Sequence, residues 1–268
     1  MSADILPPNE KMIARVEGAI GWMVFNNPDR RNALSLDMWQ AIPAILDRFE
    51  SDPTVRVVVL RGAGDKAFIS GADISEFEKI RASAEAVAHY DKVGDTALAR
   101  LTDCPKPTIA MIQGYCIGGG VGVALACDLR LAASGSRFAI PAARLGVSYR
   151  WGSIKKLVEL VGPACAKEIF YTARQLSAAE MLDMGLLNRV LPEAELDSFT
   201  RDYCARIAEN APLTLAATKT VIAELALPAA SLDRAKLEDL VKACFASEDY
   251  VEGRRAFMEK RKPVFKGT

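Results

Sequence analysis

The sequence predicts an α/β fold that is followed by a helical C-terminal region. Short runs of β-branched and other apolar residues, typical of strands buried on both faces, alternate with segments of helical apolar spacing. Strands separated by helices indicate βαβ units with parallel pairing. After Pro192 the helical periodicity continues with almost no strand signal. We therefore expect an α/β core over residues 1–195 and a helical region over residues 196–268.

The first part of the core is expected to begin with two strands and a helix. Met12–Val16 and Ile20–Phe25 have strand patterns on either side of a Glu-Gly turn. A helix is predicted over Leu36–Glu50, with Ser35 as its N-cap. Pro43 lies inside that helix and is expected to kink it, because proline removes a backbone hydrogen bond.

The rest of the core continues the same alternation. The predicted strands are Arg56–Leu60, Thr108–Gln113 and Asp128–Ala133. Helices are predicted over Gly119–Cys127, Ile154–Val161 and Ala178–Met184. The second of these ends at a Gly-Pro pair and the third at a glycine, which are common stop signals.

Composition narrows the chemistry. The chain has 268 residues with 34 basic and 34 acidic side chains, so no net charge draws it toward nucleic acid. Its single histidine, His89, lies in a polar helical stretch and is expected on the surface. Multi-histidine metal sites are thereby excluded, and the six cysteines show no ligand-like spacing, so we expect no metal. Acid–base chemistry is left to carboxylates, tyrosines, lysines or water.

The N-terminus and the longest uncharged run bear on location. The first ten residues lack a secretory signal, so a cytoplasmic protein is expected. Between Lys106 and Asp128 lie 21 uncharged residues, enough to span a bilayer. Pro107 and five glycines would break one spanning helix, so we expect a buried strand, a glycine loop and a buried helix, and no membrane span.

Two glycine patterns resemble nucleotide-binding motifs. Gly62–Ala67 matches GxGxxA after a strand, but the residues that follow do not start a helix. The glycine triplet Gly118–Gly120 lacks the GK[ST] of a phosphate loop. Binding of nucleoside phosphates through these motifs is therefore not expected.

The same glycines allow another interpretation. Gly71–Asp73 and the triplet each follow a predicted strand, Val57–Leu60 and Thr108–Gln113, and the triplet also precedes a helix. Ligands of parallel sheets bind beyond the carboxyl ends of strands, so both loops could face one crevice. Two backbone N–H groups aimed at one carbonyl oxygen form an oxyanion hole. The alternative is two tight turns that merely require glycine.

Several ordered motifs resemble the crotonase, or enoyl-CoA hydratase/isomerase, family. They are Asn27–Ser35, Ala67–Ile74, Lys106–Ala110, Gly118–Gly120, Cys127–Asp128, Phe138–Gly146, Gly162 and Ala256–Pro263. The resemblance covers about residues 12–266. It implies a crotonase-like spiral of ββα turns with a C-terminal helical trimerisation region, assembled as a homotrimer or a dimer of trimers.

The resemblance also implies a binding site for acyl-CoA thioesters. The backbone N–H groups of Ala72 and Gly119 would form an oxyanion hole for the thioester carbonyl. Ala33, Ala72 and Ile74 would line the channel for pantetheine and adenine. Phe257 and Lys260 would contact the nucleotide end of CoA in a neighbouring subunit. No cofactor beyond the CoA moiety of the substrate is implied.

Two positions depart from the family pattern. Hydratases of the family carry one glutamate three residues after the oxyanion glycine and another after the proline of a Phe-x-x-Pro segment. Here these positions are Gly122 and Ala142, and neither side chain can transfer a proton. True hydratase activity is therefore doubtful, and a non-catalytic CoA-binding protein is one alternative.

A third departure suggests a different reaction. The usual Pro-Gly-x-Gly-Gly turn is replaced by Tyr149–Ser153. The Leu-Gly-Val-x-Tyr segment that ends at Tyr149 resembles the methylmalonyl-CoA decarboxylase branch, in which the tyrosine belongs to the active site. Decarboxylation of a short branched malonyl-type thioester needs no base, only enolate stabilisation and a proton source. Tyr149 could supply the proton or could simply pack, and Arg144 or Arg150 could hold the carboxylate. Weaker candidates in the same crevice are Tyr115, Asp73 and Ser70.

Overall fold

The computed structural model describes residues 3–5, 9–73 and 83–268. A seven-stranded sheet has the order β1-β2-β3-β4-β6-β8-β11. Its strands are β1 (Ala3–Ile5), β2 (Met12–Glu17), β3 (Ile20–Phe25), β4 (Val57–Gly62), β6 (Thr108–Ile112), β8 (Leu129–Ala133) and β11 (Arg189–Leu191). The first three strands pair antiparallel, and all pairs from β3 to β11 are parallel.

A smaller sheet has the order β10-β9-β7-β5. Its strands are β5 (Ala67–Ile69), β7 (Tyr115–Ile117), β9 (Arg137–Ala139) and β10 (Leu176–Ser177). β5, β7 and β9 run parallel, and β10 pairs antiparallel with β9. Along the chain β4 leads to β5, β6 to β7 and β8 to β9, each pair being followed by a helix. This repeated ββα turn confirms the expected spiral.

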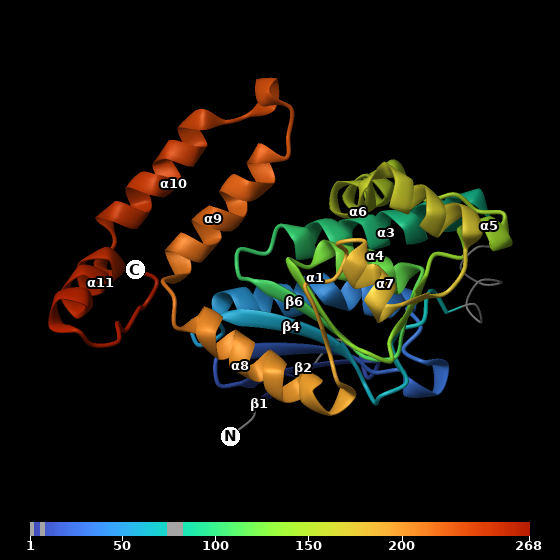
Figure 1. The fold of residues 1–268 in the computed structure, drawn as a ribbon, viewed down its shortest axis with the longest axis horizontal. Coiled ribbons are helices and arrows are strands. Elements are labelled where there is room, and N and C mark those ends of the chain that lie inside the picture. Colours follow the sequence, from blue (N-terminus) through green and yellow to red (C-terminus); the bar gives the residue numbers. More distant parts are fainter. Residues whose placement is uncertain (1–2, 6–8, 74–82) are drawn as a thin grey trace.

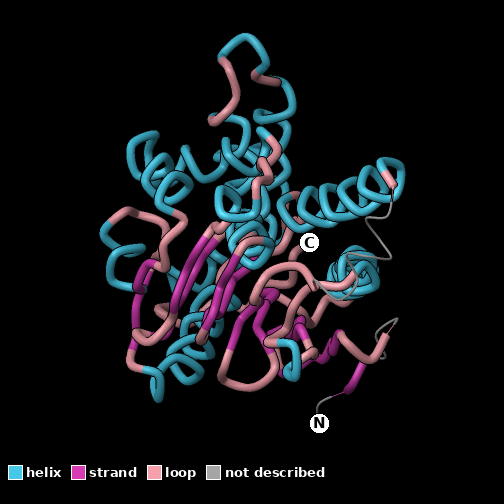
Figure 2. Tube along the Cα trace, turned by 90° about the vertical axis from the view of Figure 1, so that its right-hand side faces the viewer, coloured by secondary structure: helices cyan, strands magenta, loops and turns pink. Residues whose placement is uncertain are grey.

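Helices lie on both sides of the large sheet (Figures 1 and 2). Within the core they are α1 (Leu36–Ser51), α3 (Ala84–Thr102), α4 (Gly119–Ala126), α5 (Ala142–Leu145), α6 (Trp151–Thr172) and α7 (Ala178–Asp183), with a 3₁₀ turn η1 (Pro28–Arg30). Gly162 interrupts α6 with non-helical φ and ψ of 74° and 165°, where the sequence predicts a stop. Pro43 lies inside α1, as expected, and the helix continues through it from Leu36 to Ser51. Ser35 occupies the N-cap of α1, but its hydroxyl makes no capping hydrogen bond.

The chain becomes helical after β11. The elements are η3 (Glu193–Glu195), α8 (Leu196–Ala208), α9 (Pro212–Leu225), η4 (Ala229–Ser231), α10 (Arg234–Ala246) and α11 (Glu248–Glu259). α8 packs on the large sheet, whereas α9, α10 and α11 extend away from the core (Figure 1). The described helices include none long and apolar enough to span a membrane.

The central strands are buried on both faces, as their β-branched runs predict. Val58 and Leu60 of β4 point into the core under α1 and the smaller sheet. Val57 and Val59 point the other way, into a second core closed by α8. Because every central strand is covered twice, its backbone is held rigidly, and the loops that follow the strands have fixed positions.

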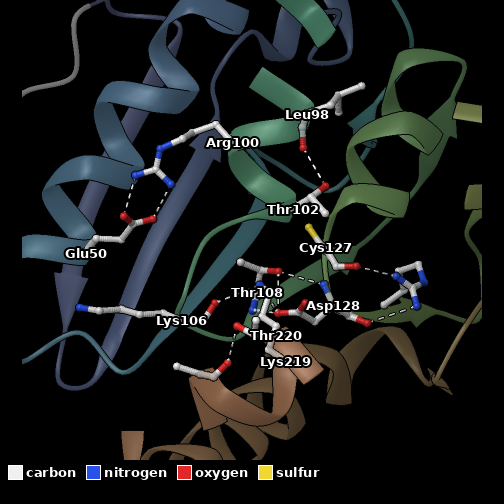
Figure 3. A network of polar contacts seen from close by, with 12 residues as sticks. Glu50, Leu98, Arg100, Thr102, Lys106, Thr108, Cys127, Asp128, Lys219 and Thr220 are labelled. Carbon is white, nitrogen blue, oxygen red and sulfur yellow. Dashed lines mark hydrogen bonds and ion pairs between the residues drawn. The ribbon is translucent and has the colours of Figure 1, made fainter. Parts of the chain in front are cut away.

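A polar network joins the extended helices to the sheet (Figure 3). Asp128 Oδ2, just before β8, accepts hydrogen bonds from Thr108 N at 2.8 Å and Thr108 Oγ1 at 3.0 Å. Lys219 of α9 donates to the same oxygen at 2.8 Å. The carboxylate therefore ties the starts of β6 and β8 to α9.

We expect Asp128→Ala to lower the free energy of unfolding by about 2 kcal/mol, since hydrogen bonds to a charged group each contribute about 1.5–3 kcal/mol. Urea denaturation at matched protein concentration measures the loss. Asp202→Ala, an exposed position on α8, is the control and should change stability by less than about 0.5 kcal/mol. Equal stability of the two variants would contradict this role of Asp128.

Candidate active site

Two glycine-containing loops meet at the edge of the smaller sheet. Gly71–Asp73 follows β5 and Gly118–Gly120 follows β7, and these two strands are parallel neighbours. The sequence placed the loops after the Val57–Leu60 and Thr108–Gln113 strands, and this was wrong, because a three-residue strand intervenes in each case. The expectation that both loops lie beyond the carboxyl ends of neighbouring parallel strands is nevertheless met in the smaller sheet.

The first loop presents the backbone N–H of Ala72. Leu34 forms a parallel β-bridge with Ala72, in which Leu34 N donates to Gly71 O at 2.8 Å and Asp73 N donates to Leu34 O at 2.9 Å. Since successive N–H groups of an extended chain point to opposite sides, the N–H of Ala72 points away from Leu34. Among the described residues nothing accepts a hydrogen bond from it.

The second loop presents the N-terminus of α4. Gly118 has a φ of 55°, which favours glycine, and its N–H donates to Ala139 O at 2.9 Å. Gly119 is the first helical residue, so its N–H has no intrahelical partner and lies at the positive end of the helix dipole. Gly120 approaches the carbonyl oxygen of Ile69 so closely that a Cβ would collide with it. The triplet therefore brings the start of α4 against the end of β5.

The Tyr149 hydroxyl lies against the same loop. A Cβ placed on Gly118 would lie 3.4 Å from the phenol oxygen and 3.8 Å from Gly71 Cα. The ring packs edge to face on Phe170 of α6, with centroids 5.4 Å apart. Burial raises the pKa of Tyr149 to about 12, because the surroundings disfavour the phenolate. Tyr149 therefore carries its proton at neutral pH.

The two departures from the family pattern lie beside these loops. Gly122 is one helical turn after Gly118, with its N–H donating to Gly118 O at 3.2 Å. Among the described residues, a Cβ at Gly122 would meet only Leu98 Cδ1, at an ordinary 3.8 Å. Ala142 begins α5 and is buried at 4% exposure. Neither position carries a group that could transfer a proton.

Next to Gly122 is a cavity of about 400 Å³ between α3, α4 and the start of α6. Leu98, Leu125 and Ala126 give it a mainly apolar lining, and Lys156 of α6 also lines it, with its ammonium donating a hydrogen bond to Thr102 Oγ1. Arg150 also lines it, but its guanidinium is engaged by Asp95 at 2.6 Å and by Asp91 at 3.0 Å. These charged residues were not foreseen from the sequence, except Arg150, because they come from helices far apart in the chain.

Of the residues predicted to line the CoA channel, the structure describes Ala33 and Ala72 but not Ile74. Ala33 is buried directly before Leu34. Its loop is held by Asn32, whose amide donates to Ala63 O at 3.0 Å and Ala67 O at 2.7 Å. Ile74 lies outside the described residues. Asn32 was missed as a positioning residue, although a polar residue inside a family motif is a signal that could have suggested it.

The C-terminal candidates lie far from the glycine loops of their own chain. Phe257 on α11 is 82% exposed, and Lys260 caps the end of that helix in a left-handed conformation. α11 lies at the opposite end of the molecule from α5 (Figure 1). The structure therefore does not bring these two residues together with Ala72 and Gly119 within one chain.

The weaker candidates are engaged elsewhere or exposed. Tyr115 begins β7 with its ring under the Arg31 guanidinium, 5.2 Å from the ring centroid. The Ser70 hydroxyl donates to the carbonyl oxygen of Arg30 at 3.2 Å. Arg144 is exposed on α5, and Asp73 is buried with its N–H bonded to Leu34 O.

His89 is exposed on α3, as expected. Cys104, Cys127 and Cys204 are buried, and burial raises the pKa of each thiol to about 12. These thiols are therefore poor nucleophiles.

Comparison with known proteins agrees with this architecture. The family model described as enoyl-CoA hydratase/isomerase matches residues 15–268. The chain is 33% identical to a short-chain-enoyl-CoA hydratase of Clostridium acetobutylicum, over 94% of this chain and 95% of that protein. It is 34% identical to a carnitinyl-CoA dehydratase of Proteus mirabilis, over 93% of this chain and 96% of that protein.

A solved structure is similar throughout. The crystal structure of an enoyl-CoA hydratase/carnithine racemase from Magnetospirillum magneticum superposes with a TM-score of 0.93 at 38% identity, covering 98% of this chain and 97% of that chain. Since the match includes both sheets and the C-terminal helices, the crotonase fold is confirmed. The chain therefore belongs to the enoyl-CoA hydratase/isomerase family, the crotonase family, whose members act on acyl-CoA.

Proposed function

We propose that this protein binds acyl-CoA thioesters and stabilises an enolate through the backbone N–H groups of Ala72 and Gly119. The observation that carries the proposal is that both donors lack partners among the described residues and belong to loops in contact with each other. Each such donor contributes about 3–4 kcal/mol of transition-state stabilisation in known oxyanion holes. Ala33, Ala72 and Ile74 would line the CoA channel.

Among the reactions of the family, hydration is poorly supported by the residues of this chain. Water must be activated on one side of the enoyl double bond, and a proton must be delivered to the α-carbon. Gly122 and Ala142 supply neither group. The proposed site has the backbone N–H groups that stabilise an enolate but lacks the two glutamates that usually transfer protons.

Decarboxylation is the alternative reaction that a specific observation favours, namely the protonated Tyr149 beside Gly118. In a malonyl-type thioester the bond between the α-carbon and the carboxylate breaks, and CO₂ leaves. The electron pair enters the enolate held by the two N–H groups, and Tyr149 or a water then protonates the α-carbon. Because Arg150 is already paired with two aspartates, we no longer favour it as the partner of the departing carboxylate.

Tyr149→Phe is expected to slow formation of propionyl-CoA from methylmalonyl-CoA by about 100-fold or more while leaving the affinity for the thioester unchanged, since proton transfer contributes about 10²–10⁴-fold. Product formation is followed by mass spectrometry. Tyr171→Phe, 75% exposed on α6, is the matched control and should keep the wild-type rate. An unchanged rate in Tyr149→Phe would remove the tyrosine from the mechanism.

The pH profile gives the same residue a second test. A free tyrosine loses its proton near pH 10, whereas burial raises the pKa of Tyr149 to about 12. The acid form therefore persists through pH 10, and the decarboxylation rate should show no tyrosine-dependent fall there.

If methylmalonyl-CoA and every other thioester bind without turnover, the non-catalytic CoA-binding alternative stands instead.

The assembly proposal rests on the C-terminal helices. Phe245, Val251, Phe257 and Met258 are exposed on α10 and α11, which extend from the core. A homotrimer or dimer of trimers would cover such apolar side chains and would carry Phe257 and Lys260 to the CoA nucleotide of a neighbouring subunit. We keep a cytoplasmic location as part of the same proposal, together with the absence of any cofactor beyond CoA.

A further inference from the structure

The cavity beside Gly122 is lined by one cation, Lys156, that forms no ion pair with a described residue, although the nearby carboxylates of Asp103 and Glu159 favour its charged form. Lys156 is half-buried, lines the cavity and donates a hydrogen bond to the neutral hydroxyl of Thr102. Within the described parts of the chain no carboxylate forms an ion pair with its ammonium, whereas the adjacent, exposed Lys155 pairs with Glu159 at 3.5 Å. Burial lowers the pKa of Lys156, because the charged form loses solvent.

The other charges of the cavity compensate one another. Arg150 is held by Asp95 and Asp91, so the end of the cavity near the glycine loops contains a paired group. The remaining walls are mainly apolar, from Leu98 and Leu125 among others. A half-buried charge in such surroundings is costly unless a ligand or side chain of opposite sign pairs with it. The cavity is therefore complementary to an apolar chain that ends in an anionic group.

The position of Lys156 suits the far end of an acyl chain. α4 begins at Gly119, and Gly122 and Ala126 both line the cavity along it. Seven residues of α-helix separate Gly119 from Ala126, a length of about 10 Å. On α6, Gly152 and Lys156 are four residues apart and line the same cavity from the other side. An acyl chain that starts at Gly119 and follows α4 past Gly122 would enter this cavity, which Lys156 also lines.

We propose that the acyl group of the substrate carries a carboxylate at the end remote from the thioester, and that Lys156 binds this carboxylate. The inference rests on the proposed function, since it takes the thioester carbonyl to lie at Gly119. Gly122 contributes by leaving space for the chain, because within the described part of the protein a Cβ there would meet only Leu98.

Calorimetric titration with adipyl-CoA and hexanoyl-CoA tests the inference, because the two acyl chains have the same length and differ in the terminal carboxylate. We expect the wild-type protein to bind adipyl-CoA at least about tenfold more tightly. Lys156→Met, which keeps an unbranched side chain one atom shorter and removes its charge, should abolish this preference. Lys155→Met, the neighbouring exposed lysine, should retain it in full.

The binding results distinguish failure of the role of Lys156 from failure of acyl-CoA binding. Equal affinity of the wild type for the two thioesters overturns the role of Lys156 and leaves acyl-CoA binding intact. Loss of affinity for both ligands to the same extent in Lys156→Met also overturns it, because the lysine would then be structural. Failure of the wild type to bind either thioester overturns the proposed function itself. The wild-type comparison remains decisive even if Lys156→Met does not fold.

Discussion

Replacing Gly122 and Ala142 together by glutamate is expected to raise the rate of crotonyl-CoA hydration by about 100-fold or more over a low wild-type rate. The double variant would restore two carboxylates beside the glycine loops, and acid–base groups contribute about 10²–10⁴-fold to such reactions. Gly122 lines the cavity, and a Cβ there meets no described atom closer than Leu98 Cδ1 at 3.8 Å. Loss of the enoyl absorbance on hydration measures the rate.

The control is the double replacement of the same positions by glutamine. Glutamine has the shape of glutamate but cannot accept or donate the proton at neutral pH. We expect it to leave hydration at the wild-type level, so that any gain in the glutamate pair reports proton transfer. Fast hydration of crotonyl-CoA by the wild-type protein would contradict the view that these two positions have lost the hydratase function.

Removing the Gly119 N–H by Gly119→Pro is expected to reduce turnover of any thioester substrate by about 10²–10³-fold. Proline is tolerated at the first position of a helix, where its missing N–H has no intrahelical partner. Gly119 occupies this position in α4, so the substitution removes the donor and retains the helix. Single-turnover rates on the best substrate of an acyl-CoA panel measure the effect.

Gly119→Ala separates loss of the donor from added bulk. Its Cβ would lie 3.2 Å from Leu34 Cδ1, a contact that a small movement of the leucine relieves, and its N–H is kept. We expect a rate within a few-fold of the wild type. Comparable losses in the alanine and proline variants would mean that space at Gly119, rather than its N–H, limits the reaction.

The longer elements could be predicted from the sequence because each has a sufficient pattern. Ile20–Phe25 is recovered as β3, and the β-branched run at Val57 forms β4, buried on both faces as its residues indicate. The stop at Gly162 is found as a break in α6. In these cases the local preference and the buried position agree, so periodicity is enough.

The smaller sheet could not be predicted in the same way. β5, β7 and β9 have three residues each, which is too short for an alternating pattern to be distinguished from a turn. The sequence therefore assigned the two glycine loops to the wrong strands, although their placement beside each other followed from parallel pairing. The proposed roles of Ala72 and Gly119 come from the resemblance between motifs and not from periodicity.

The cavity could not be predicted because no single segment encodes it. Leu98, Gly122 and Lys156 come from three helices and meet only when the spiral closes. In the sequence, Gly122 occupies a position where hydratases of the family carry a glutamate. In the structure, Gly122 also lines the cavity that Lys156 lines. The same glycine thus bears on both the expected loss of hydration and the proposed preference for a carboxylate-bearing chain.

The proposed function depends on binding of the thioester carbonyl by the Ala72 and Gly119 N–H groups. The most direct test is an isotope-edited infrared difference spectrum of hexanoyl-CoA labelled with ¹³C at that carbonyl and bound to the protein. Two hydrogen bonds should shift the carbonyl band to lower frequency than in water, and Gly119→Pro should reverse part of the shift while Gly119→Ala keeps it. A band at the same frequency as in water, in the wild-type complex, would contradict the account.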